Sequence, residues 1–213
     1  ISGLRSRSTD YDDDGVDEVW RLGDIVHSTP AVAGIPGDNY ETLYGDKSYA
    51  TFKATYYNRR QVVYVGGNDG MIHAFNGGFF DASTTQFKLT DSTVTPNPPS
   101  HPLGAELWGY VPYNLLPHLK WLTEPGYQHV YYMDGEPRLY DVNIFTPDST
   151  HVEGWGTILV VGMRFGGSPI DIDSNDDGTF DKTLRSAYVV LDVTDPEQPP
   201  VLLGELSDTD MGF

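Results

Sequence analysis

The chain has 213 residues, 38% of them hydrophobic and 13% aromatic, so it is long and apolar enough to bury a core in one domain or two small ones. Its 31 Asp and Glu outnumber 13 Lys and Arg, and the formal net charge of -18 repels phosphate backbones and anionic lipids, so we expect no nucleic-acid partner. The chain contains no cysteine, which excludes disulfides, thiolate nucleophiles and Cys-ligated zinc.

Targeting signals are not visible in the sequence. No apolar run approaches the roughly 20 residues that cross a bilayer. The first residues, ISGLRSRST, lack the apolar centre of a signal peptide. Because the chain starts at Ile1 and not at methionine, it resembles a processed piece, and any export signal is expected upstream of it.

The first half of the chain contains one clear hairpin. Residues 61–65 (QVVYV) and 71–75 (MIHAF) predict two strands, and Asn68, Asp69 and Gly70 favour a tight turn between them. Residues 39–60, which lie before this hairpin, show no clean helical or alternating period. Residues 104–112 (GAELWGYVP) predict another strand, and residues 114–122 (NLLPHLKWL) predict a short helix.

A second unit of strands follows. A turn is predicted at Asp134 and Gly135, a strand over residues 155–163 (WGTILVVGM), and two more strands around the proline turn within residues 185–206. Antiparallel units of about four strands, with recurring Gly and aromatic residues, are typical of propeller blades. We therefore predict an all-β fold, a partial β-propeller of about two blades with long loops and a short helix. Residues 1–19 form an acidic segment leading into a propeller region at 20–213.

Two acidic segments have the spacing of calcium loops, which need six to eight oxygen ligands. Such loops supply side chains at positions one, three, five and nine and a carbonyl at position seven, with glycine at position six for the turn. The first loop is residues 10–18, and the second is residues 173–181, which is inserted in a blade hairpin. Both follow this pattern. The predicted ligands are Asp173, Asn175, Asp177, the Thr179 carbonyl and Asp181 in the second loop, and Asp10, Asp12, Asp14, the Val16 carbonyl and Glu18 in the first.

The two acidic segments could also be solvated turns that bind no metal, because Asp, Asn and Gly favour turns in any case. An EF-hand needs a glutamate ligand at position twelve. That position is Arg21 in the first loop and Leu184 in the second, so these loops are not EF-hands. Calcium fits the pattern better than magnesium, which prefers a strict octahedron and retains water.

The remaining chemistry-bearing residues receive structural interpretations. His27, His73 and His129 lie in strand-like segments, lack an H-E-x-x-H arrangement and are given no role. Trp108 and Trp155 are expected at matching blade positions, where they would pack between blades. The adjacent Arg59 and Arg60 are expected to be a solvated surface pair.

Five segments together resemble the C-terminal propeller domain of the PilY/PilC family of type IV pilus-associated adhesins. They are WRLGDIVHSTPAVAG, QVVYVGGNDGMIHAFNGG, GAELWGYVPYNLLPHLKWL, GWGTILVVGMRFGG and SAYVVLDVTDPEQPPVLLGEL. The resemblance covers about residues 20–213. It implies a modified quinoprotein-like propeller, and the loop at 173–181 matches the calcium loop of family members. The segment at 10–18 resembles an additional upstream loop.

The resemblance also implies a function. It implies a non-enzymatic, calcium-binding protein at the cell surface or pilus tip, exported through the periplasm and supporting pilus biogenesis, twitching motility and adhesion. Its partners would be minor pilins or other tip components, host or abiotic surfaces, and the remaining propeller blades. Two alternatives stay open: a quinoprotein dehydrogenase, because STPAVAG and VYVGGNDGMIHAF also resemble repeats of those enzymes, and an integrin-like ligand-binding propeller with structural calcium.

Overall fold

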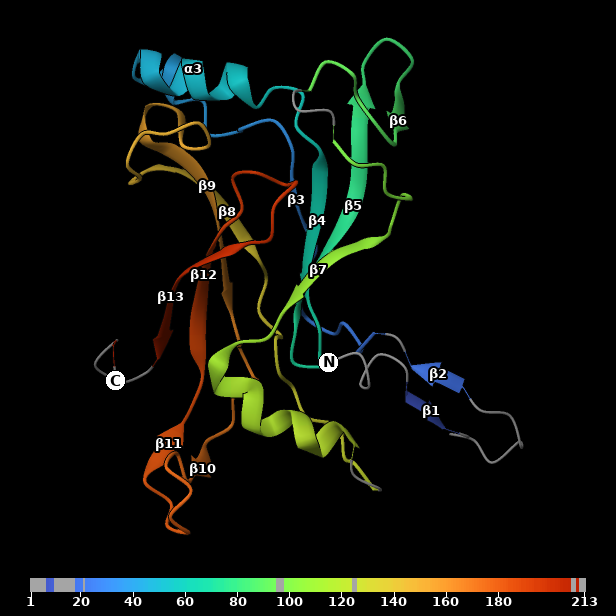
Figure 1. Ribbon diagram of the computed structural model, residues 1–213, viewed down its shortest axis with the longest axis vertical. Helices are drawn as coiled ribbons and strands as arrows, with labels where there is room; N and C mark the ends of the chain where they lie inside the picture. Colours follow the sequence, from blue (N-terminus) through green and yellow to red (C-terminus); the bar gives the residue numbers. More distant parts are fainter. Residues whose placement is uncertain are drawn as a thin grey trace.

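The computed structural model describes residues 7–9, 18–20, 22–94, 98–123, 126–207 and 210, with only the backbone for 7–9, 18–20 and 123. Two antiparallel sheets stand side by side and run along the long axis of the molecule (Figure 1). The first consists of β3 (Ala31–Ala33), β4 (Gln61–Gly66), β5 (Ile72–Asp81) and β7 (Glu106–Tyr110), with β6 (Gln86–Lys88) paired to the last residues of β5. The second consists of β8 (Arg138–Asn143), β9 (Trp155–Gly162), β12 (Ala187–Asp192) and β13 (Val201–Ser207).

Each sheet contains a four-stranded antiparallel meander, and in the first sheet β6 also pairs with the far end of β5. In the first, β3 pairs β4, β4 pairs β5 and β5 pairs β7. In the second, β8 pairs β9, β9 pairs β12 and β12 pairs β13. Two short hairpins lie outside these sheets, β1 (Arg7–Thr9) with β2 (Glu18–Trp20) and β10 (Ile170–Ile172) with β11 (Lys182–Leu184). The predicted strands and the two-unit organisation are confirmed.

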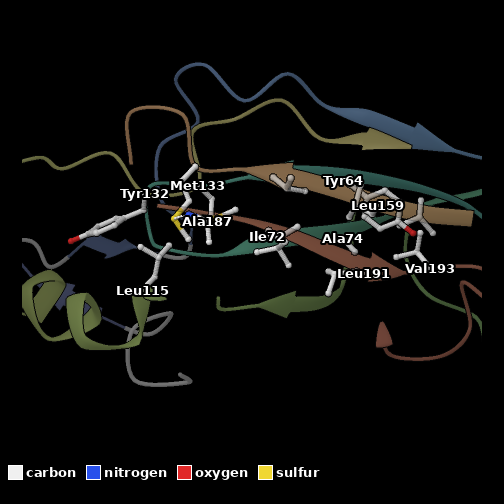
Figure 2. Packing of buried hydrophobic residues seen from close by; sticks show 14 of the residues in the cluster. Tyr64, Ile72, Ala74, Leu115, Tyr132, Met133, Leu159, Ala187, Leu191 and Val193 are labelled. Atoms are coloured by element: carbon white, nitrogen blue, oxygen red, sulfur yellow. Dashed lines mark hydrogen bonds between the residues drawn. The ribbon is translucent and has the colours of Figure 1, made fainter. Parts of the chain in front are cut away.

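The core lies where the two sheets face each other. Alternation along β4 turns Val62 and Tyr64 inward, while β9 turns Leu159 and Val161 toward them. Figure 2 shows side chains of both sheets gathered in one cluster. Full burial of each aliphatic side chain stabilises the fold by about 1.5–3 kcal/mol. The contact between the sheets is therefore the main source of stability.

Glycines allow the segment that leads into the second sheet to pass close to other backbone. The Gly135 amide donates to the Gly162 carbonyl at 3.0 Å, and a Cβ on Gly135 would lie 2.1 Å from that oxygen. Gly66 has the same role, because its Cβ would lie 2.2 Å from the Met133 carbonyl oxygen. Any larger side chain at either position would push the backbone segments apart.

Two helices occupy the region where no period was expected. They are α2 (Tyr40–Leu43) and α3 (Lys47–Thr55), and Asp46 caps α3 by accepting from the backbone amides of Ser48 and Tyr49 at 2.8 and 3.1 Å. Only Tyr49 and Phe52 of α3 are buried, so the apolar face is too narrow for a strong helical pattern. The local signal for α3 was Asp46, because aspartate is a favoured residue at the N-cap of a helix. The predicted helix at 114–122 is confirmed as the 3-10 helix η1 (Tyr113–Thr123), and a one-turn η2 (Val152–Gly154) precedes β9.

The two tryptophans do not occupy matching positions. Trp108 lies in β7, the outer strand of its sheet, and packs on Tyr64 with ring centroids 5.6 Å apart. Trp155 begins β9, the second strand of its sheet, and packs on Tyr49 of α3 at 4.8 Å. Trp155 therefore anchors the helix to the second sheet, which sequence spacing did not indicate.

The expectation that Arg59 and Arg60 are a solvated pair is wrong. They are 8% and 1% exposed, because they precede β4 at the junction of the two sheets. Arg59 donates to the Gly34 carbonyl, to Thr157 Oγ1 at 3.0 Å and to the Thr194 carbonyl at 3.2 Å. Each bond satisfies a buried polar group, which explains how the charge is tolerated inside.

Candidate functional site

The acidic segment 173–181 is the loop of the β10–β11 hairpin. The hairpin lies between β9 and β12, which is the place that the short turn at 67–70 takes between β4 and β5 in the first sheet. In Figure 1 it extends beyond the end of the second sheet, at the bottom of the view. Ile172 pairs Lys182, and the Asp181 amide donates to the Ile172 carbonyl at 3.0 Å. The acidic segment therefore lies between the second and third strands of its sheet.

Asp173 organises the loop. Its Oδ1 accepts from the amides of Asn175 at 3.3 Å and Asp177 at 3.2 Å, and its Oδ2 accepts from the Gly178 amide at 2.6 Å. The turn needs left-handed backbone at Gly178, where φ is +86°. Glycine adopts this conformation without steric cost.

The other predicted ligands are held by bonds within the same loop. Asp177 accepts from the Thr179 amide at 2.8 Å and from Asn175 Nδ2 at 3.0 Å. Asp181 accepts from the Ser174 amide at 2.9 Å and Ser174 Oγ at 2.8 Å, which closes the loop on itself. The structure thus brings the five predicted residues of this segment into one compact turn.

These bonds determine the charge state of the loop. Burial acts to raise the pKa of Asp173, but backbone donors led by Gly178 outweigh it, and the pKa lies below the ordinary value. The Thr179 amide and Asn175 side chain lower the pKa of Asp177. Hydrogen bonds from Ser174 lower the pKa of Asp181, and they outweigh burial and the like charge of Asp173, which raise it. All three carboxylates are therefore ionised at neutral pH, although they repel one another.

In the described part of the chain, acidic and histidine side chains alone do not form a metal site. Among the residues that the structure describes, no three His, Asp or Glu side chains converge closely enough to hold a metal ion. The loop instead offers a mixed set of donors: three carboxylates, the Asn175 amide oxygen and the Thr179 carbonyl. An ionised carboxylate has about four acceptor positions. A carboxylate that already accepts from backbone amides therefore keeps a free acceptor position with which to bind a hard cation.

The first acidic loop lies largely outside the described residues. Asp10, Asp12, Asp14 and Val16 are not described, and of Glu18 the structure describes only the backbone, which pairs with Thr9 at the start of β2. The calcium loop at residues 10–18 remains a prediction.

Sequence reasoning missed a set of histidine–carboxylate pairs. His27 Nδ1 lies 2.8 Å from Asp134 Oδ2, and His129 Nε2 lies 2.9 Å from Asp24 Oδ2. Of the three histidines expected in strand-like segments, only His73 lies in a strand. The partners of His27 and His129 are 107 and 105 residues away in the sequence, so no local signal indicated them.

Two adjacent four-stranded meanders that pack face to face, one carrying an acidic hairpin between its second and third strands, define consecutive blades of a β-propeller. The chain belongs to the family of PilY1 beta-propeller domains, whose model matches residues 22–183, more than half of the chain. The helices of the described residues include none long and apolar enough to span a membrane.

Two named relatives match 90% of the chain. The chain is 34% identical over 197 residues to a type IV pilus biogenesis factor PilY1 homolog of Xylella fastidiosa, covering 90% of the chain and 12% of that protein. It is 29% identical over 202 residues to the type IV pilus biogenesis factor PilY1 of Pseudomonas aeruginosa, covering 90% and 13%. The crystal structure of the P. aeruginosa PilY1 C-terminal domain matches at 24% identity and a TM-score of 0.45, covering 83% of this chain and 25% of that one. The chain spans only about an eighth of the length of the first two relatives.

Proposed function

We propose that this chain is the calcium-binding propeller region of a type IV pilus-associated adhesin and assembly factor. Membership of the PilY1 propeller family, whose relatives are named type IV pilus biogenesis factors, carries the pilus assignment. In this proposal the protein is not an enzyme and acts outside the cell, at the surface or pilus tip. It supports pilus biogenesis, twitching motility and adhesion to host or abiotic surfaces, in contact with minor pilins or other tip components and with further blades of its own propeller.

The geometry of residues 173–181 supports calcium as the ligand. The loop concentrates ionised carboxylates on a turn already held by backbone donors. Such preorganisation reduces the entropy lost when the loop closes around an ion. A divalent cation would also cancel the repulsion between Asp173 and Asp181. Asp173, Asn175, Asp177, Asp181 and the Thr179 carbonyl would hold it.

Calcium would act on the structure by mass action. Ion binding favours the ordered loop by RT ln(1 + [L]/Kd), and calcium sites of extracellular modules have Kd values of about 10⁻⁴ to 10⁻³ M. The loop would therefore become ordered at the calcium levels outside cells. Because β11 enters the second blade directly, this ordering would stiffen one end of that blade.

Isothermal titration calorimetry with calcium tests the site. We expect Asp177→Asn to lose one equivalent of bound calcium, because it removes a ligand charge. Asp176→Asn is the matched control, since it removes the same charge in the same loop at a position that is no ligand, and asparagine tolerates the left-handed φ of +60° there. Equal calcium uptake by the wild type and Asp177→Asn would contradict the assignment.

The pilus role is tested with the same pair of variants in the full-length protein of the source bacterium. We expect Asp177→Asn to reduce surface piliation and the diameter of twitching zones, and Asp176→Asn to leave both unchanged. Normal pili and twitching in a strain lacking the whole protein would refute the pilus assignment and leave the calcium result standing.

A further inference from the structure

A cavity of about 690 Å³ opens between the outer parts of the two blades. Its walls come from the end of β7 and the start of η1 on one side, and from β11 and β13 on the other. The volume lies within the range of about 300–1,000 Å³ typical of ligand sites. The predicted calcium ligands within 173–181 do not line it.

Glu205 is the one carboxylate among the described residues that line the cavity, and it is already engaged. Tyr110 Oη donates to Glu205 Oε1 at 2.7 Å, and the Tyr113 amide donates to both oxygens of Glu205 at 3.0 Å. Burial and the bond to Glu205 raise the pKa of Tyr110, so this hydroxyl remains a donor at any physiological pH. Glu205 therefore fastens the two blades together and is poorly available to a ligand.

Two cations lie on the opposite wall. Lys182 and Arg185 both line the cavity and are exposed to solvent. The Lys182 Nζ lies 4.9 Å from the centre of the Tyr113 ring, and no carboxylate of the described residues comes within 4.0 Å of it. The neighbouring Asp181 carboxylate is turned toward Ser174. Lys182 is thus held by an aromatic ring, which leaves its charge available to an anion.

This local charge is opposite to that of the whole molecule. Among the described lining residues, Glu205 is bonded to Tyr110 and Tyr113, while the Lys182 charge is exposed, on a chain with a formal net charge of -18. Apolar groups accompany the cations, because Leu116 and Leu202 line the cavity and are 49% and 47% exposed. A ligand that matches these walls carries a carboxylate beside aliphatic groups.

The neighbouring strands indicate the form of such a ligand. β7 and β13 are the outer strands of their sheets, and no further strand of the described residues pairs with either. An extended peptide suits a cavity whose walls include two such outer strands, since its side chains alternate between opposite walls. We propose that this cavity binds an extended acidic peptide segment of a partner protein, with a Glu or Asp side chain on Lys182 and aliphatic side chains against Leu116 and Leu202.

Fluorescence polarisation with labelled, end-blocked peptides of alternating Leu and Glu tests the proposal, at one fixed calcium concentration. We expect the Leu-Glu peptide to bind about tenfold more tightly than a Leu-Gln peptide of equal length, because a charge-assisted bond is lost with Gln. In Lys182→Gln this preference should disappear. Lys47→Gln, which removes an exposed charge at the start of α3, at the opposite end of the molecule in Figure 1, should retain it.

Three outcomes would overturn the proposal: no saturable binding of the Leu-Glu peptide, equal binding of the Leu-Gln peptide, or an unchanged preference in Lys182→Gln. Lys182 is exposed, so its replacement should leave the fold intact, and circular dichroism of the variant verifies this. Asp177→Asn is titrated in parallel. Loss of calcium binding with retained peptide preference separates this site from the calcium loop.

Discussion

His73 is a buried histidine that bridges two carboxylates. Its Nε2 lies 3.0 Å from Asp69 Oδ2 and its Nδ1 lies 2.9 Å from Glu106 Oε1, while the residue is 1% exposed. Burial lowers the pKa of His73, but the bonds and charges of Asp69 and Glu106 outweigh burial and raise it above 6.5. The imidazolium joins the turn before β5 to the outer strand β7.

This pair of contacts predicts a pH-dependent stability. Because the pKa of His73 is raised in the folded state, its stabilisation is complete below about pH 6.5 and is lost as the pH rises through the raised folded value. Urea unfolding across this range should show a falling free energy of unfolding in the wild type. His73→Gln should be less stable at low pH and show a flatter profile. His129→Gln, at an exposed pair, serves as the control, and an equal flattening there would contradict the assignment.

At the scale of elements, the segment entering β4 joins the two blades through Arg60. Arg60 Nε and Nη2 lie 2.8 and 3.1 Å from the two carboxylate oxygens of Glu197, beyond β12, and Nη1 donates to Asn76 Oδ1 in β5 at 2.8 Å. Its guanidinium also lies 4.7 Å from the centre of the Phe79 ring. A flexible lysine cannot reproduce this planar, two-point contact.

Breaking this bridge should destabilise the contact between the blades. We expect Arg60→Met to lower the free energy of unfolding by about 3 kcal/mol, since it leaves Glu197 without its charged partner and removes one of the donors to Asn76 Oδ1. The double variant Arg60→Met with Glu197→Met should recover part of the loss, because no unpaired carboxylate remains. Urea denaturation of the four proteins in this double-mutant cycle gives the coupling energy. A coupling near zero would show that the bridge adds nothing.

At the scale of the whole molecule, the second sheet has one face in the core and one outside it. Tyr140, Tyr188 and Leu206 project from the outer face and are 47–48% exposed. Further blades of the proposed propeller would cover such a face. In the 213-residue chain alone, the charge of -18 opposes association through this face.

We therefore expect reversible self-association that grows with salt. Salt shortens the Debye length to about 3 Å at 1 M, which weakens repulsion and leaves the apolar contact unscreened. Sedimentation velocity should show a rising apparent mass with salt, and Tyr188→Glu should suppress it. Tyr44→Glu is the control, because Tyr44 is 77% exposed beside α2, away from this face. A monomer at every salt concentration would contradict the prediction.

Local patterns explain how much of the fold was predictable. The runs of β-branched residues in β4 and β9 and the Asn-Asp-Gly turn act over a few residues, so the sequence indicates them directly. The same holds for the candidate loop at 173–181, because its donors and Gly178 lie within nine consecutive positions. The α3 helix was missed because its buried face consists of only Tyr49 and Phe52.

The sequence by itself determined the blade strands, their turns and the position of an acidic loop within a blade hairpin, since each depends on neighbouring residues. Only the tertiary structure decided that Arg59 and Arg60 are buried, that His73 bridges two carboxylates and that Lys182 faces a cavity shared with Glu205. His73 contacts Glu106 across 33 positions of the sequence, and Arg60 contacts Glu197 across 137. The walls of the cavity likewise belong to both blades. Such proximity follows from how the two sheets pack, and packing has no local signature in the sequence.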